Sequence, residues 1–141
     1  MQRQIHIPRS VIGGVLILIL LGSQLEAGEP TLVEVEKIWD RAAHSAFTDL
    51  IRFDGKWLCC FREATTHGSK DGKIRIIEST DGKEWVSVGL GVEKEIDLRD
   101  PKLSIDPKGS LVLVMGGIRQ RGGSYLSRSP RISFSTDSRS W

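Results

Sequence analysis

The sequence contains few cysteines and few histidines, which limits how a small domain could be cross-linked or equipped with a metal. Its two cysteines, Cys59 and Cys60, are neighbours. Successive residues of a strand point to opposite faces, so a disulfide between them would be strained, and we expect two buried thiols. The three histidines, His6, His44 and His67, are scattered and show no metal-ligand spacing. The sequence therefore predicts no metal site and no cofactor.

A large excess of charge of one sign is also lacking. Lysine and arginine total 20, and aspartate and glutamate total 18, which gives a formal net charge of +2. Loss of an N-terminal leader containing Arg3, Arg9 and Glu26 would remove a net +1 and leave +1. This balance favours neither a nucleic-acid partner nor a membrane-surface partner.

A hydrophobic run long enough to span a bilayer is missing as well. The apolar stretch of residues 11–21 is eleven residues long, and it would rise roughly 16 Å as a helix, against a hydrocarbon core of about 30 Å. Two arginines precede it and small residues follow it, which is typical of a secretory signal peptide cleaved after Ala27. We therefore expect residues 1–27 to direct export to the periplasm or the exterior, with no membrane contact after cleavage. An uncleaved membrane anchor is the alternative.

The rest of the chain is predicted to contain short strands separated by tight turns. Residues 28–44 are expected to form an N-terminal strand or linker. Turn dipeptides such as Asp54-Gly55 and Asp81-Gly82 then separate alternating or apolar segments. We predict strands over residues 49–53, 56–63, 73–79, 84–90, 101–105, 110–117 and 131–135. Between the last two we expect a glycine- and arginine-rich loop over residues 118–130.

These landmarks repeat at nearly one period. Gly109 follows Gly55, and Ser135 follows Ser79, at almost the same separation along the chain. A repeat of about 55 residues, with apolar runs at 57–61 and 111–115 that need cover on both faces, predicts stacked four-stranded sheets. We therefore expect an all-β fold, a β-propeller of four-stranded antiparallel blades, with one blade at 45–92 and an incomplete blade at 97–141. A sandwich of about seven strands is the structural alternative.

The repeated heptads STDGKEW (79–85) and STDSRSW (135–141) resemble the Asp-box, Ser-x-Asp-x-Gly-x-Thr-Trp, of sialidase-like propellers. Both are one residue shorter than the box and lack its threonine, and Ser138 stands where glycine is usual. The resemblance implies a structural turn between the third and fourth strands of a blade rather than a catalytic motif. It assigns this role to Ser79, Asp81, Gly82, Trp85, Ser135, Asp137 and Trp141. Complete members of the family have six blades, so it also implies that the chain is an N-terminal portion.

The resemblance extends over residues 45–141 and implies a glycoside hydrolase. Phe61-Arg62-Glu63 falls at the family's Phe-x-Glu sequence, and Asp71 lies in the loop that carries the acid/base aspartate. Ala46-Phe47-Thr48 replaces Arg-Ile-Pro, so the first arginine of the carboxylate-binding triad is missing. The other two arginines and the nucleophilic tyrosine belong to later blades, and Tyr125 is not expected to replace that tyrosine.

Charged residues at predicted strand ends are the candidate site residues, because inner strand ends converge on the mouth of a propeller. Arg99-Asp100-Pro101 also resembles the Arg-Asp-Pro motif of five-bladed glycosidases, whose aspartate stabilises the transition state. The candidate catalytic residues are Asp71, Glu63, Asp100 and Asp49, and the candidate substrate-binding residues are Arg62, Arg99 and His67. Each has a structural alternative, a turn or an ion pair. The basic loop at 119–131 is interpreted as a solvated loop or, alternatively, as a contact for an anionic sugar.

Three functions follow from these features. The first is an exported sialidase-like protein that acts on glycans by acid/base hydrolysis. The second is a propeller module that binds a glycan or a protein without catalysis. The third is an inactive truncated remnant, for which exposed sheet edges predict poor solubility. The oligomeric state is left open.

Overall fold

A computed structural model describes residues 29–141, and the predicted signal peptide lies outside the described residues. The chain divides into two compact units, Met1–Val35 and Glu36–Trp141. In the first unit, the described residues 29–35 form no helix or strand, and the same is true of residues 36–43 at the start of the second. Within the described part of the chain, no helix is long and apolar enough to cross a membrane.

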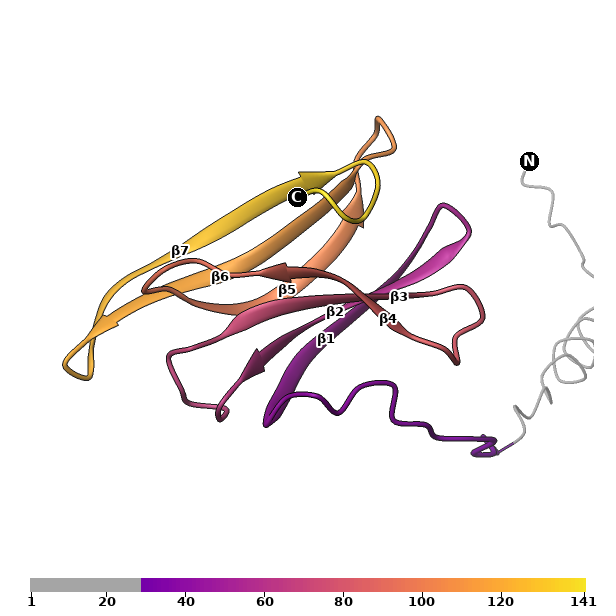
Figure 1. Cartoon of the computed structure of the whole chain (residues 1–141), viewed down its shortest axis with the longest axis horizontal. Coiled ribbons are helices and arrows are strands. Elements are labelled where there is room, and N and C mark those ends of the chain that lie inside the picture. The colour runs from indigo at the N-terminus through magenta and orange to yellow at the C-terminus, as the bar shows by residue number, and fades with distance from the viewer. Residues whose placement is uncertain (1–28) are drawn as a thin grey trace, which may run out of the picture. The chain divides into compact units, whose positions relative to one another are not determined.

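The unit Glu36–Trp141 is all-β, as predicted. It contains two antiparallel sheets, one with the order β1-β2-β3-β4 and one with the order β5-β6-β7 (Figure 1). Alternating side chains and the predicted turn dipeptides place the strands close to their expected positions. The strands are β1 (His44–Phe53), β2 (Lys56–Ala64), β3 (Lys73–Ser79), β4 (Val86–Gly91), β5 (Asp97–Ile105), β6 (Leu111–Arg121) and β7 (Ser124–Ser135).

The prediction of a long loop over residues 118–130 was wrong. β6 continues to Arg121 and β7 begins at Ser124, so Gly122 and Gly123 alone form the turn, with φ of 56° and 88°. Two consecutive positive φ values suit a tight hairpin turn, and glycine adopts them without a steric cost. Serines and arginines hid the apolar alternation in this segment, which is why the hairpin was not recognised.

One apolar core lies between the two sheets. Leu58, Cys60, Ile74 and Ile76 contribute to it from the first sheet, and Leu103, Leu111, Leu113 and Met115 contribute from the second. Trp141 packs against this core from the C-terminal turn. At roughly 25 cal/mol per Å² of apolar surface removed from water, contact between the sheets is a main source of stability for this unit.

The registers of the two sheets define equivalent positions. Trp57 pairs with Ser79 in the first sheet, and Leu111 pairs with Ser135 in the second. Since these serines open the two repeated heptads, β2 corresponds to β6 and β3 corresponds to β7. Counting back along β3 and β7 from the two serines makes Ile76 equivalent to Ile132. Counting forward along β2 and β6 from Trp57 and Leu111 makes Cys59 equivalent to Leu113.

Equivalent faces of the two sheets have different neighbours. Ile76 is buried in the core between the sheets, with 2% of its surface exposed, whereas its equivalent Ile132 is 60% exposed. Conversely, Cys59 lies on the outer face of the first sheet, whereas its equivalent Leu113 lies in the core between the sheets. The sheets therefore stack head to tail, one face of the first against the opposite face of the second.

The outer face of the first sheet is covered by tryptophans. Cys59, Phe61 and Ile77 form a second buried cluster there, against which Trp39 and Trp85 pack. Trp39 belongs to the segment that precedes β1, and its ring centroid lies 6.0 Å from that of Phe61. The N-terminal segment thus covers an apolar face that would otherwise be exposed.

The two repeated heptads form nearly identical turns. Ser79 Oγ and Ser135 Oγ each donate a hydrogen bond of 3.0 Å to Oδ1 of the aspartate two residues later. Asp81 then accepts the backbone N–H groups of residues 83 and 84, and Asp137 accepts those of residues 139 and 140. Gly82 and Ser138 occupy equivalent positions, with φ of 80° and 64°. Ser138 thus adopts a left-handed backbone conformation that is easier for glycine.

Candidate functional site

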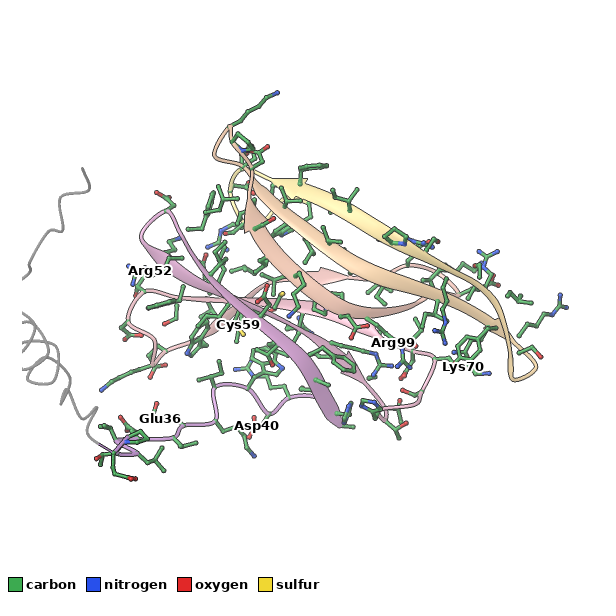
Figure 2. The ribbon with its side chains drawn as sticks, turned by 180° about the vertical axis from the view of Figure 1, so that it is seen from behind. Glu36, Asp40, Arg52, Cys59, Lys70 and Arg99 are labelled. Atoms are coloured by element: carbon green, nitrogen blue, oxygen red, sulfur yellow. The ribbon has the colours of Figure 1, made fainter. Side chains whose placement is uncertain are left out.

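The candidate site residues other than Asp49, which lies in the middle of β1, are at one end of the two sheets. The β2–β3, β4–β5 and β6–β7 connections lie at this end, and we call it the loop end (Figure 1). The turns β1–β2 and β5–β6 and both heptad turns lie at the opposite end, away from the candidates. In Figure 2, Lys70 and Arg99 lie near each other at the loop end, and Arg52 lies at the far end. The heptad aspartates therefore have no place in a site at the loop end.

Arg62 is wholly buried and points between the sheets. Its Nε and Nη2 donate to Asp97 Oδ1 at 3.2 and 2.9 Å. Nη1 donates to the carbonyl oxygen of Thr66 at 3.2 Å, and Nη2 also donates to that of Ser69 at 2.9 Å. This guanidinium holds the β2–β3 loop against β5, which matches the structural alternative for Arg62. Asp97 was not among the predicted site residues, because no local pattern identifies a partner so far away along the chain.

Arg99 and Gly72 complete the contacts of Asp97. Arg99 Nε donates to Asp97 Oδ2 at 2.6 Å, and Gly72 N donates to Oδ1 at 3.0 Å. A Cβ atom at position 72 would lie only 2.1 Å from Asp97 Oδ1 and 2.4 Å from the carbonyl oxygen of Leu98. Only glycine fits this close approach of the loop to β5.

Asp71 is exposed in the β2–β3 loop. The N–H of Thr65 donates to both of its carboxylate oxygens, at 3.2 and 3.1 Å. Hydrogen bonds from the side chains of Ser69 and Thr65 hold the pKa of Asp71 well below its usual range. A general acid at neutral pH needs a raised pKa, so in this arrangement Asp71 is an ionised hydrogen-bond acceptor.

Glu63 follows Arg62 in β2 and points to the opposite face of the sheet. Arg75 donates to its two oxygens at 3.1 and 2.9 Å, and Trp39 Nε1 donates to Oε1 at 2.7 Å. The bond from Trp39 attaches the segment before β1 to the outer face of the first sheet, and the bonds from Arg75 join β3 to β2. Glu63 therefore lies on a different face from Arg62, and all three bonds have a structural role.

β-bulges occur at equivalent places in β1 and β5, the first strands of the two sheets. The register shifts between Ala46 and Asp49 in β1, and between Arg99 and Lys102 in β5. Arg99 and Asp100 thus lie inside a strand, and the prediction that they precede it was wrong. Asp100 has a φ of 49° and is exposed. A non-glycine residue with positive φ at a bulge is a common feature of functional sites.

Asp49 joins the first strands of the two sheets. Its Oδ2 accepts a hydrogen bond of 2.7 Å from the N–H of Leu103. Lys102 Nζ lies 3.9 Å from Oδ1 of the same carboxylate. These contacts hold β1 beside β5 next to their bulges, so the Asp49 side chain has a structural role in joining the two sheets.

His67 packs on the beginning of β1. Its ring centroid lies 5.5 Å from that of His44, edge to face, and 5.4 Å from that of Phe47. Nε2 of His44 is buried without a hydrogen-bond partner among residues 29–141. In that same range, no three His, Cys, Asp or Glu side chains are placed to hold a metal ion.

Three cavities at the loop end bring polar side chains together. One, with a volume of about 560 Å³, is lined by Lys70, Glu95, Ile118, Arg119, Gln120, Arg121 and Leu126. Another, of about 390 Å³, includes Arg99, Asp100 and Arg128 in its wall. The third, of about 230 Å³, includes the predicted residues Glu63 and Asp71. Sequence reasoning did not single out Lys70 or Glu95, because their neighbours come from other loops. The alternation of arginine with other residues at 118–121 could have indicated that Arg119 and Arg121 share one face of a strand.

Comparisons with known proteins support the fold but name no function. No family model matches the sequence, and no curated protein matches it. A solved structure from Dyadobacter fermentans DSM 18053, described as a protein of unknown function, has a TM-score of 0.57 and 22% sequence identity. The match covers 70% of this chain and 35% of that chain, so the present chain spans about a third of the similar structure.

Proposed function

We propose that the chain is part of an exported, sialidase-like β-propeller whose loop end binds glycans. The described residues are proposed to bind rather than to cleave. The observation that carries this proposal is that the cavities of about 560 and 390 Å³ and most of the charged candidate residues lie at the same end of two repeated sheets. The heptad turns, which carry the family resemblance, lie at the other end.

Head-to-tail stacking supports the propeller over the sandwich. In a two-sheet sandwich the inner faces pack on each other and the outer faces are solvated. Here the face that holds Ile76 in the first sheet is equivalent to the exposed face that holds Ile132 in the second. A repeat in which one face packs on the opposite face of the next sheet is the geometry of propeller blades.

The heptad turns support the family assignment. In both, the tryptophan Nε1 donates to a carbonyl oxygen three residues earlier, at 2.9 Å for Trp85 and 3.0 Å for Trp141. In both copies the serine Oγ accepts the N–H of the aspartate, and the aspartate accepts the N–H groups two and three residues after it. The shortened heptads therefore perform the local folding task that the family assigns to its box.

The hydrogen-bond contacts of the candidate carboxylates, and the lowered pKa of Asp71, favour binding over hydrolysis. Glu63 is engaged by Arg75 and Trp39, and Asp49 accepts the N–H of Leu103. The lowered pKa of Asp71 is unsuited to a general acid. Asp100 alone favours hydrolysis as a second candidate function, because it is exposed beside the 390 Å³ cavity.

Affinity gel electrophoresis against a panel of soluble polysaccharides tests this proposal. The purified full chain, with folding checked by circular dichroism, should be retarded by at least one glycan and should release no reducing sugar from it. A folded chain that none of the glycans retards would refute the binding function. Release of reducing sugar that is lost in Asp100→Asn would favour the hydrolase instead.

A further inference from the structure

The cavity of about 560 Å³ at the loop end combines positive charge with an apolar surface. Three cations, Lys70, Arg119 and Arg121, line it against one carboxylate, Glu95, which leaves a local charge of +2. This equals the formal net charge of the whole chain. Ile118 and Leu126 also contribute to the wall. We name this cavity the basic cleft.

The cations of the basic cleft form no ion pair within residues 29–141, because the salt bridges there involve none of the three side chains. Glu93 lies nearby but is already engaged by Arg131, whose Nε and Nη2 donate to it at 2.7 and 3.0 Å. Hydrogen bonding and charge from Arg131, together with the charge of Arg119, lower the pKa of Glu93. The remaining positive charge of the cleft is available to a ligand.

The backbone beneath these cations is held in place. Arg119 and Arg121 belong to a paired hairpin, with Arg119 opposite Ser127 and Arg121 opposite Ser124. Lys70 follows Ser69, whose carbonyl oxygen accepts bonds from Arg62 at 2.9 Å and Arg99 at 3.2 Å. The buried Arg62–Asp97 pair thus has a consequence at the surface, because it fixes the loop that carries Lys70. A preorganised backbone lowers the entropy that binding must offset.

We propose that the basic cleft binds an acidic glycan chain, one that carries carboxylate or sulfate groups. This proposal rests on the proposed glycan-binding function and names the class of glycan. Arginine side chains hold carboxylate and sulfate oxygens with paired N–H donors, and lysine adds a point charge. Ile118 and Leu126 suit the C–H face of a sugar ring, and Glu95 accepts hydrogen bonds from ring hydroxyls.

The test compares dextran, dextran sulfate and polygalacturonate as probes for the full chain in affinity gels and isothermal titration calorimetry. The wild-type chain should bind at least one acidic polymer about tenfold more tightly than dextran. The two acidic polymers distinguish sulfate from carboxylate as the recognised group. Arg119→Gln/Arg121→Gln should lose that preference, and Lys70→Gln alone should weaken binding to the same polymer.

The matched control is Lys83→Gln/Lys108→Gln, which removes two exposed positive charges from the opposite end. It should bind like the wild type if the cleft is the site. Equal weakening in this control, or a preference for single-stranded DNA over both acidic polymers, would overturn the acidic-glycan proposal. Equal binding of dextran and the acidic polymers would overturn it but leave glycan binding intact. A folded chain that binds none of the three would overturn both proposals.

Discussion

Arg62 of β2 and Asp97 of β5 form an ion pair in which neither side chain has any exposed surface, with 2.9 Å between Nη2 and Oδ1. The pair connects the two sheets and, through the carbonyl oxygens of Thr66 and Ser69, holds the β2–β3 loop. A buried ion pair contributes little over an apolar replacement of both partners, but the loss of one partner leaves the other desolvated. The pair therefore serves mainly to position the β2–β3 loop against β5. Removal of one partner should lower the stability of the fold markedly.

The change Arg62→Met should lower the free energy of unfolding by about 3 kcal/mol, because Asp97 keeps Arg99 as a partner but loses its buried guanidinium. Urea unfolding followed by circular dichroism at pH 7 measures this loss. The control is Arg131→Gln, which breaks the exposed pair with Glu93 and should change the free energy of unfolding far less. Equal losses in the two variants would contradict the assignment of a central structural role to Arg62.

The sequence was sufficient for features that depend on neighbouring residues. Alternating side chains and turn dipeptides such as Asp54-Gly55 predicted the strands, and the heptads predicted two equal turns. The hairpin over residues 118–130 was missed because arginines and serines replaced the apolar alternation that identifies a strand. Asp100 was placed before β5 because its proline neighbour indicates a turn, whereas the chain forms a bulge there.

The candidate site could be predicted only in part, because its contacts join distant segments. Sequence position correctly placed Arg62, Asp71 and Arg99 at one end of the sheets. It did not reveal that Asp97 pairs with the buried guanidinium of Arg62. It also did not reveal that Glu63 lies on the other face of the sheet, in contact with Trp39. The basic cleft depends on Lys70 meeting the end of β6, and only the packing of the two sheets determines that contact.

The adjacent cysteines should be unreactive in the folded protein. Burial, together with the charge of Asp49, raises the pKa of Cys59 to about 11 and that of Cys60 to about 12. Because the thiolate is the nucleophile, the folded chain should react with a disulfide reagent far more slowly at pH 8 than the same chain in urea. Rapid reaction of two thiols per chain before unfolding would contradict the buried position of both side chains.

The heptad aspartates should make the fold sensitive to acid. Hydrogen bonds from the backbone of Ser140 and Arg139 and from the side chain of Ser135 hold the pKa of Asp137 well below its usual range. Asp81 is shifted in the same direction, first by the backbone N–H of Glu84. A lowered folded-state pKa gives a stabilisation that is complete above the unfolded value, near 4, and is lost as the pH falls below it.

Melting temperatures measured between pH 7 and pH 2 test this effect. The wild-type chain should lose stability below about pH 4, and Asp137→Asn should show a smaller acid-dependent loss because it has no charge to neutralise. Ser135→Ala keeps the charge but removes a hydrogen-bond donor, so its acid dependence should lie between the two. If the melting temperature depended on pH in the same way in all three proteins, the Asp137 carboxylate would not contribute to the acid sensitivity.

The equivalent residues Ile76 and Ile132 provide a direct test of head-to-tail stacking. Ile76→Ala removes a side chain from the core between the sheets and should lower the free energy of unfolding by about 2–5 kcal/mol. Ile132→Ala changes a side chain that is 60% exposed and should cost less than about 1 kcal/mol at low protein concentration. The same urea unfolding experiment measures both. If the sheets instead packed through equivalent faces, the two substitutions would cost similar amounts. A cost at Ile132 that grows with protein concentration would show that another copy of the chain covers this face, since only association makes apparent stability depend on concentration.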